Sequence, residues 1–432
     1  MNYLYLYLIV GVLIMGFYLR RQQRINASHT GQLQESIESG LTEPPTLHPV
    51  VDLARCMGSG ACVKACPEHA LGVVNGKAVL INAAHCIGHG ACRSACPVEA
   101  IKLVFGTETR GVDIPNIAPN FETNVPGIFI AGELGGMGLV RKAAEQGRHA
   151  MESIRKSMAG SSSSTDFDVL IVGCGPAGIS AGLSAIEHKI RYKLLEQEDS
   201  LGGTVYHYPR QKVVMTAPVE LAIIGKTKFN EVRKETLLEF WLEVVRKTGL
   251  QISFHERMEG IEKTGNGFVV HTNKGSYTAK MVLLTMGRRG TPRKLDVPGE
   301  ESSKVIYRLI DPEQFKDQSV LVVGGGDSAL EAAIALSEQE GTKVTLSYRA
   351  AAFSRVKQKN RVLLDQQQQA GRLLVLLNSK VQRITEQSVE IEYAGKVQQH
   401  RNDVVIVCAG GLLPKPLLEK IGIRFDTKFG TE

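Results

Sequence analysis

The sequence predicts an α/β protein in which two domains of alternating strands and helices follow a small cysteine-rich α+β domain. Two glycine-rich turns, at Gly173 and Gly324, each lie between a β-rich run and a helical run. Six of the eight cysteines lie between Cys56 and Cys96. From Asp168 onward short β-rich runs alternate with longer helical runs, which is typical of a parallel α/β sheet.

Length and composition indicate a globular protein. The 432 residues are enough for about three ordinary domains, and 43% hydrophobic with 22% charged residues can form and cover their cores. The net charge of +7 is mild, and no basic stripe is interleaved with aromatic residues, so we expect no nucleic-acid partner. The clustered cysteines precede a long α/β sequence, and this context favours metal binding by the cysteines over disulfide bonds.

The chain begins with an apolar run. Tyr3 to Leu19 carries no charge and would span roughly 26 Å as a helix, close to the hydrocarbon thickness of a bilayer. Arg20, Arg21 and Arg24 follow and favour the cytoplasmic side. We therefore predict a single-pass transmembrane helix over residues 1–20, in the inner (cytoplasmic) membrane, with the body in the cytoplasm. A signal peptide and a buried helix are the alternatives.

Changes of composition divide the rest of the chain. In order, the predicted segments are a linker (21–49), the cysteine-rich domain (50–105), a segment ending in a helix (106–159), a GSSSST linker (160–165), a first dinucleotide-binding domain (166–299), a second one (300–402) and a return to the first (403–432).

Two cysteine repeats match each other at a spacing of thirty residues, CMGSGACVKACP from Cys56 and CIGHGACRSACP from Cys86. Both resemble the bacterial two-cluster ferredoxin pattern C-x2-C-x2-C-x3-C-P, in which the fourth cysteine serves the other cluster. The resemblance implies a ferredoxin-like domain with two iron–sulfur clusters. A zinc module and a decayed remnant are the alternatives.

Both repeats depart from that pattern at its second cysteine, where Ser59 and His89 stand. The crossed connectivity of the ferredoxin pattern implies one cluster on Cys56, Cys62 and Cys96 with Ser59 as candidate fourth ligand, and another on Cys86, Cys92 and Cys66 with His89 as candidate. Each cluster would be 4Fe-4S, or 3Fe-4S where the fourth ligand is missing. An imidazole in place of a thiolate would raise the reduction potential.

The first glycine-rich turn has the G-x-G-x-x-G spacing of a Rossmann fingerprint and lies between the run FDVLIV and a helical stretch. Its glycines permit a tight turn and the approach of a pyrophosphate to the helix N-terminus. An acid that ends the next β-run is placed to bind ribose hydroxyls, and the LGGT sequence after it resembles the flavin-adjacent loop of two-dinucleotide-domain flavoproteins. We predict FAD here, with a bare nucleotide-binding domain as the alternative. The assigned residues are Gly173, Gly175, Pro176, Ala177, Gly178, Glu196, Gly202, Gly203 and Thr204.

The second glycine-rich turn follows the run SVLVV and has alanine at its third small position. No acid ends the next strand; Arg349 and Arg355 lie there instead, and a guanidinium group matches a 2′-phosphate. NADPH is therefore favoured over NADH, unless the arginines only cover a helix. The assigned residues are Gly324, Gly326, Asp327, Ser328, Ala329, Arg349 and Arg355.

From residue 168 onward the sequence resembles thioredoxin-reductase-like flavoproteins, and the segment LGGTVYHYPRQKVVMTAPVELAIIG is most similar to their bacillithiol disulfide reductase branch. The resemblance implies FAD, a nucleotide domain inserted within the FAD domain, and hydride delivery to the flavin. No C-x-x-C pair follows residue 100, and Ala177 stands where that branch carries a cysteine. We therefore expect no dithiol relay, and structural roles for Cys174 and Cys408.

Flavoproteins of this family close with a T-x-V-P-G-I-F-x-A-G-D strand whose acid holds the FAD ribityl chain. Here the matching sequence, TNVPGIFIAGE from Thr123, lies before the FAD fingerprint instead of after it. This order indicates a circular permutation, with Gly132 and Glu133 as FAD-binding residues. The helix after Gly138 would then point its positive end at the reduced flavin. An unrelated glycine-rich loop is the alternative.

Together these features predict a membrane-anchored NAD(P)H-dependent flavin oxidoreductase. Electrons would pass from NADPH through FAD to two iron–sulfur clusters and on to an unidentified acceptor, either a quinone, a cytochrome or a ferredoxin. The chemistry lies at FAD, so no catalytic side chain is assigned. The alternatives are a reductase of a small disulfide or other soluble substrate, a non-catalytic redox sensor, and electron flow in the reverse direction; a homodimer is also considered.

Overall fold

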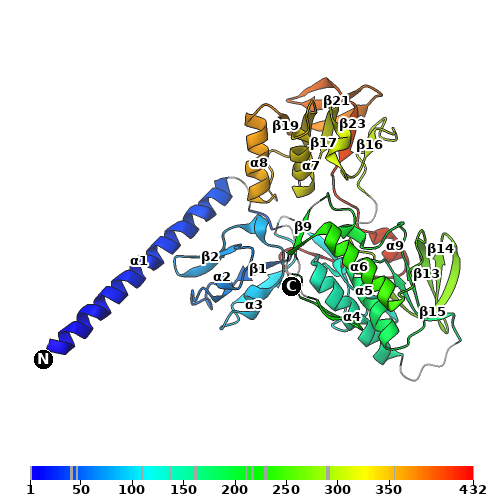
Figure 1. Ribbon diagram of the computed structural model, residues 1–432, viewed down its shortest axis with the longest axis horizontal. Helices are drawn as coiled ribbons and strands as arrows, with labels where there is room; N and C mark the ends of the chain where they lie inside the picture. Colours follow the sequence, from blue (N-terminus) through cyan, green and yellow to red (C-terminus); the bar gives the residue numbers. More distant parts are fainter. Residues whose placement is uncertain are drawn as a thin grey trace. The chain divides into compact units, whose positions relative to one another are not determined.

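The computed structural model (Figure 1) divides into two compact units. Unit 1 comprises residues 1–111, 350–363 and 429–432, and unit 2 comprises residues 112–349 and 364–428. The described residues are 2–431 without 39–41, 45, 46, 109, 137, 159–163, 211, 216, 217, 228, 230, 289–291 and 355, and side chains are also left out at 2–6 and 215. Most of the predicted second linker and Arg355 therefore lie outside the described residues.

Unit 1 begins with one unbroken helix, α1 (Asn2–Glu38). Among its described side chains, the large apolar residues between Tyr7 and Leu19 are exposed. Over the described residues, no helix combines the length and apolar character that crossing a membrane requires. On this finding the predicted transmembrane anchor and inner-membrane localisation are wrong. The expected linker is likewise helical up to Glu38.

The second half of α1 packs on the cysteine-rich domain. The amide of Val73 donates to His29 Nδ1 at 3.0 Å, and the amide of Asn75 donates to Asn26 Oδ1 at 2.8 Å. A Cβ atom on Gly72 would lie 2.9 Å from the His29 ring, so this glycine permits the close approach of the helix.

The cysteine-rich domain is built from two matching halves. Strands β1 (His48–Val51) and β4 (Ile101–Val104) form one antiparallel pair, and β2 (Leu71–Val74) and β3 (Lys77–Leu80) form the other. Two one-turn helices, α2 (Ala61–Lys64) and α3 (Ala91–Ser94), follow the two cysteine loops, and a 3-10 turn η1 (Ala83–His85) precedes the second loop. The predicted α+β domain with an internal repeat therefore forms.

Unit 2 contains a sheet in which β15 is central. Its strands are β7 (Phe167–Val172), β8 (Tyr192–Leu195), β13 (Met258–Thr264), β14 (Gly267–Thr272) and β15 (Gly275–Leu284), in the order β13-β14-β15-β7-β8. Strand β6 (Ile128–Ile130) pairs in parallel with the end of β15, with Ile128 opposite Val282. Helices α4 (Val140–Ser157), α5 (Pro176–Glu187) and α6 (Lys234–Thr248) contribute buried residues to the core of this region.

A second parallel sheet has the order β16-β23-β17-β18-β19, with α7 (Asp327–Ser337) after β17 and α8 (Gln358–Gln369) after β18. An antiparallel sheet of β20, β21 and β22 packs on it through residues such as Ile391. The bounds are β16 Val305–Ile306, β17 Ser319–Val323, β18 Lys343–Tyr348, β19 Leu373–Leu377, β20 Lys380–Ile384, β21 Ser388–Tyr393, β22 Lys396–Arg401 and β23 Val404–Val407. Because β23 pairs with β17 in this sheet, the return to the first domain begins after β23 and not at residue 403.

Short elements complete unit 2. The strand β24 (Phe425–Lys428) returns to pair with β5 (Val112–Pro115), and α9 (Lys415–Lys420) packs its Leu418 against the first sheet. The remaining elements are η2 Glu133–Gly135, η3 Gly203–Val205, β9 Val213–Met215, β10 Glu220–Leu221, β11 Gly225–Lys226, β12 Glu231–Arg233 and η4 Pro312–Phe315.

Candidate functional site

The two cysteine loops have the same backbone shape. Gly58 and Gly60 in the first loop and Gly88 and Gly90 in the second all have φ between +66° and +78°. A Cβ atom on Gly58 would lie 2.1 Å from the carbonyl oxygen of Gly76, and one on Gly88 would lie 2.6 Å from that of Leu47. A side chain at Gly58 or Gly88 would clash with this backbone, so glycine lets each loop pass close to a neighbouring segment.

Cys56, Cys62 and Cys96 line one small pocket, together with Ser59 and Val98. The amide of Ala78 donates to Cys56 Sγ at 3.4 Å, and the amide of Ala100 donates to Cys96 Sγ at 3.3 Å. Sulfur atoms that converge on a cavity and accept backbone hydrogen bonds fit an iron–sulfur cluster. The predicted ligand set of the first cluster is thus brought together.

Cys66, Cys86 and Cys92 form the corresponding group in the second half. Burial raises the pKa of the Cys92 thiol to about 11, with further contributions from the charges of Cys86 and Cys66. The amide of Ala70 donates to Cys66 Sγ at 3.4 Å, which repeats the contact made at Cys96. Buried thiols of this kind become thiolates when a metal binds, which couples cluster binding to proton release.

All eight cysteines are described, and all are free thiols. Among the described residues, no three His, Cys, Asp or Glu side chains converge on a point where one metal ion would touch them all. A cubane is compatible with this spacing, because each of its protein ligands binds a different iron atom of the cluster.

The FAD fingerprint has the geometry that its glycines predict. Gly173 has φ +102°, and a Cβ atom on Gly178 would lie 1.9 Å from the carbonyl oxygen of Gly173, so α5 must pack closely on β7 here. A Cβ atom on Gly175 would meet nothing within 4 Å, which leaves space beside the start of α5. Pro176 opens the helix. This arrangement fits a dinucleotide pyrophosphate.

Glu196 lies beside this turn, at the end of β8. Its carboxylate is buried and accepts hydrogen bonds from the amides of Cys174 at 2.8 Å and Glu198 at 3.0 Å. Burial raises the pKa of the Glu196 carboxyl above its ordinary value. The LGGT loop lies at the same place, because a Cβ atom on Gly203 would be 3.2 Å from the Cα atom of Gly175. Thr204 lies in the adjoining turn η3, and Gly202 precedes it.

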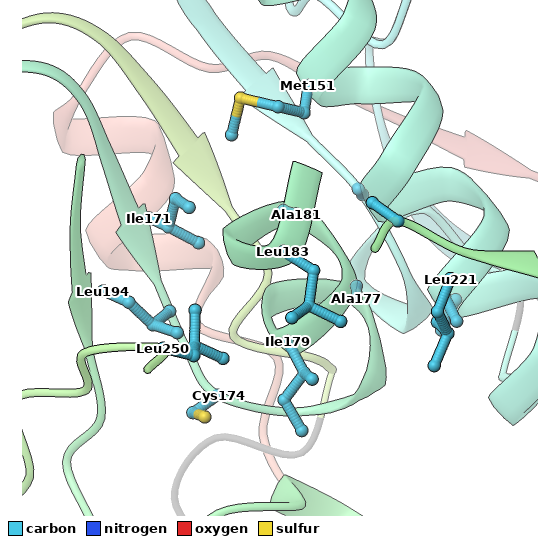
Figure 2. Packing of buried hydrophobic residues seen from close by; sticks show 14 of the residues in the cluster. Met151, Ile171, Cys174, Ala177, Ile179, Ala181, Leu183, Leu194, Leu221 and Leu250 are labelled. Atoms are coloured by element: carbon cyan, nitrogen blue, oxygen red, sulfur yellow. The ribbon is translucent and has the colours of Figure 1, made fainter. Parts of the chain in front are cut away.

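The segment with Gly132 and Glu133 also reaches the fingerprint. A Cβ atom on Gly132 would lie 3.0 Å from Ala177 Cβ, and its amide donates to Gln146 Oε1 at 2.8 Å. Helix α4 crosses α5 so closely that a Cβ atom on Gly147 would lie 2.1 Å from the Ala177 carbonyl oxygen. Figure 2 shows part of the buried cluster to which both helices contribute, including Met151 of α4 and Ala181 and Leu183 of α5.

Sequence reasoning missed three residues of this region, Gln146, Gly147 and Arg288. Burial lowers the pKa of the Arg288 guanidinium, while the charges of Glu133 and Asp113 act against this shift. Its Nη2 donates to the carbonyl oxygen of Asp113 at 2.8 Å. A glycine within a predicted helix is the one signal that pointed to Gly147.

The second fingerprint repeats this design. Gly324 has φ +151°, and a Cβ atom there would lie 2.4 Å from the carbonyl oxygen of Cys408, whereas one on Gly326 would meet nothing within 4 Å. Asp327 and Ser328 begin α7, and Ala329 is buried against the turn. Arg349 is exposed just after β18, and its contact with a 2′-phosphate stays a prediction.

Comparison with known proteins identifies both parts of the chain. Residues 170–429 match the pyridine nucleotide-disulphide oxidoreductase family, and residues 48–97 match a 4Fe-4S dicluster domain. Because the first match covers more than half of the sequence, the chain belongs to the pyridine nucleotide-disulphide oxidoreductase family.

Two curated relatives are similar over most of their own length. Bacilliredoxin reductase Bdr of Bacillus subtilis is 27% identical, over 60% of this chain and 82% of the relative. The ferredoxin–NADP reductase of Thermus thermophilus is 30% identical, over 61% of this chain and 81% of the relative. Another ferredoxin–NADP reductase, from Ignicoccus hospitalis, is 32% identical, over 43% of this chain and 57% of the relative.

Solved structures show the same fold. The bacillithiol disulfide reductase Bdr (YpdA) from Bacillus cereus is 25% identical, with a TM-score of 0.54, over 60% of this chain and 82% of that one. The chain is thus a flavin-dependent pyridine-nucleotide oxidoreductase with a 4Fe-4S domain. The predictions of an enzyme and of FAD, NADPH and iron–sulfur clusters as its cofactors are confirmed.

Proposed function

We propose that this chain is an NADPH-dependent oxidoreductase whose own cysteine-rich domain exchanges electrons with its flavin domain and passes them to an external acceptor. The observation that carries the proposal is that one chain combines a reductase fold with a dicluster domain. Several relatives are named ferredoxin–NADP reductase, and here a ferredoxin-like domain belongs to the same chain. The acceptor is a quinone, a cytochrome or a separate ferredoxin.

The division of labour follows from electron counting. Oxidation of one NADPH to NADP⁺ releases two electrons and a proton as a hydride, whereas one iron–sulfur cluster carries one electron at a time. FAD supplies the conversion between two-electron and one-electron transfer when it is bound. The protein's part would be to hold the nucleotides. The turns at Gly175 and Gly326 would bind the pyrophosphates, Glu196 would bind a ribose and Arg349 would bind a 2′-phosphate.

A thiol relay, as in the disulfide-reductase alternative, has little support in this chain. Cys174 is fully buried within the FAD turn, and burial raises the pKa of Cys408 to about 12. Neither cysteine has a partner at C-x-x-C spacing. A thiol with a raised pKa is a poor nucleophile at neutral pH, because the thiolate is the reactive form.

We also propose that residues 123–157 do the work of the segment that closes the FAD domain in related flavoproteins, so that the chain is circularly permuted relative to them. The parallel pairing of β6 with β15 supports this proposal. The contacts of Gly132 with Ala177 and Gln146 support it as well. Glu133 would then bind the ribityl chain of FAD.

An anaerobic titration of the purified full-length chain with NADPH tests the proposed electron route, with flavin absorbance and cluster EPR followed together. We expect flavin bleaching followed by cluster reduction, and reoxidation of both when an electron acceptor is added. The variant Cys174→Ala/Cys408→Ala should behave like the wild type. Clusters that stay oxidised while the flavin is fully reduced would refute the route, and reduced protein that no acceptor reoxidises would indicate a sensor.

Substitution of Glu133 tests the permutation. Glu133→Ala removes a hydrogen bond from a charged acceptor and should weaken FAD binding about tenfold or more in equilibrium dialysis. Glu152→Ala, on α4 of the same segment, removes a surface carboxylate paired with Arg155 and is the matched control. Equal FAD affinities for the two variants would contradict the assignment of Glu133.

A further inference from the structure

Among the positions at which the two cysteine repeats differ, two bear on the surroundings of the cysteine groups. Where the first repeat has Ser59, the second has His89, and where the second repeat has Val98 after its last cysteine, the first has Glu68. The last cysteine of each repeat joins the other group, so Val98 lines the cavity of Cys56, Cys62 and Ser59. Glu68 belongs correspondingly to the second group, where its charge acts on both Cys86 and His89.

The environments of Ser59 and His89 are not alike. Ser59 is exposed, and its Oγ accepts a long hydrogen bond of 3.5 Å from the amide of Ala61. His89 is half-buried, and its Nε2 is buried without a hydrogen-bond partner. Glu68 Oε1 is also buried without a partner. Buried polar atoms are rarely left unpaired, so the free Nε2 of His89 indicates an occupant that it can bind. The Glu68 carboxylate is an acceptor and can take the hydrogen on the other ring nitrogen.

We propose that His89 is the fourth protein ligand of the second iron–sulfur cluster, through Nε2, and that Glu68 is a positioning residue for its imidazole. This proposal rests on the binding of two clusters by the domain. A carboxylate beside a metal-bound histidine fixes the ring orientation and the tautomer, which leaves the other nitrogen as the ligand. Ser59 lines the pocket of the first group, but it is exposed and its Oγ already accepts a hydrogen bond from the amide of Ala61. We therefore assign it no iron, and the first cluster has three thiolates from the protein.

Exchange of imidazole for thiolate has an electrostatic consequence. A cluster with three thiolates and a neutral imidazole carries about one negative charge less than one with four thiolates, and its reduction potential is higher. The second cluster is therefore the one that electrons from the nucleotide reduce more readily. His89→Cys should lower its potential, and Glu68→Gln, which removes a nearby negative charge, should raise it.

Pulsed EPR on the reduced full-length chain, with and without ¹⁵N-labelled histidine, tests the proposal directly. We expect a strong nitrogen hyperfine coupling that changes on labelling and is lost in His89→Ala and His89→Cys. His69→Asn is the matched control, since this histidine is exposed beside the second group and asparagine tolerates its φ of +50°. Ser59→Ala should leave the coupling and both potentials unchanged.

Iron and sulfide analysis separates the possible failures. Two full clusters without a histidine coupling, or a coupling that persists in His89→Ala, would overturn the ligand assignment alone. Protein purified anaerobically without iron would overturn the cluster assignment as well. Should His89→Ala lose its second cluster, His89→Cys distinguishes the outcomes, because it should restore iron content at a lower potential. A Glu68→Val variant with unchanged coupling and potential would show that Glu68 does not position the ring.

Discussion

Replacement of Gly147 by alanine should disturb the FAD site from a distance. The new Cβ atom would lie 2.1 Å from the carbonyl oxygen, 2.8 Å from the carbonyl carbon and 3.0 Å from the Cα atom of Ala177. All three are backbone atoms at the start of α5, so no side-chain rotation can relieve the contact. Helix α4 must therefore move away from α5 by about 1 Å.

The expected cost combines two opposite effects. Overpacking of this kind costs about 3 kcal/mol at its upper end, and alanine regains about 1 kcal/mol of helix propensity over glycine. We expect a net loss of about 2 kcal/mol. Because Gln146 holds the amide of Gly132, movement of α4 also displaces Glu133. If displacement of Glu133 costs FAD binding a similar free energy of about 2 kcal/mol, the affinity for FAD should fall by more than tenfold.

Urea unfolding and FAD equilibrium dialysis measure the two effects separately. Gly31→Ala makes the same substitution in α1, where a Cβ atom would meet nothing within 4 Å, and should be neutral or slightly stabilising. A Gly147→Ala variant with wild-type stability and FAD affinity would refute the packing argument.

Two further predictions concern the nucleotide and the pH dependence of stability. Arg349→Ala should raise the KM for NADPH more than that for NADH, and equal increases in steady-state kinetics would mean that this arginine does not read the 2′-phosphate. Hydrogen bonds from Arg191 lower the pKa of Asp168 to about 2. The folded pKa is below the unfolded one, so this contribution to stability is full above about pH 4 and is lost as the pH falls towards 2. Because the Arg191 guanidinium is half exposed, Asp168→Asn should lower the free energy of unfolding by about 1 kcal/mol at pH 7. In urea unfolding, the stability of this variant should therefore fall less than that of the wild type between about pH 4 and pH 2.

The local motifs were predictable because the conformation of each depends on a few residues that are close together in the sequence. The turns at Gly173 and Gly324 take positive φ where their spacing requires it, and the paired cysteine loops take the same backbone shape in both repeats. The strand at Ile128 was also predictable from its resemblance to a strand of thioredoxin-reductase-like flavoproteins. Such features depend on residues within about ten positions of one another.

The sequence could not predict features that depend on contacts between distant segments. Arg288 meets Asp113 across 175 positions of the chain, and neither residue lies in a motif. The sequence of β23 is an apolar run that would suit a buried strand of either sheet, and its pairing with β17 assigns it to the second sheet. Residues 21–38 are polar in sequence, but their helix is supported by contacts such as that of His29 with Val73. Polar composition alone therefore indicated a linker where tertiary contacts favour a helix.

The repeat in the cysteine-rich domain allows side-chain effects to be separated from backbone effects. The loops have matching φ angles, and the amides of Ala70 and Ala100 donate to equivalent sulfur atoms at 3.4 and 3.3 Å. With the backbone equal, the difference between the clusters must come largely from the side chains that differ. Ser59→His combined with Val98→Glu should therefore give the first cluster a second histidine coupling in pulsed EPR and a higher potential. If no second coupling develops while both clusters remain loaded, the two side chains are not sufficient to define the histidine-ligated site.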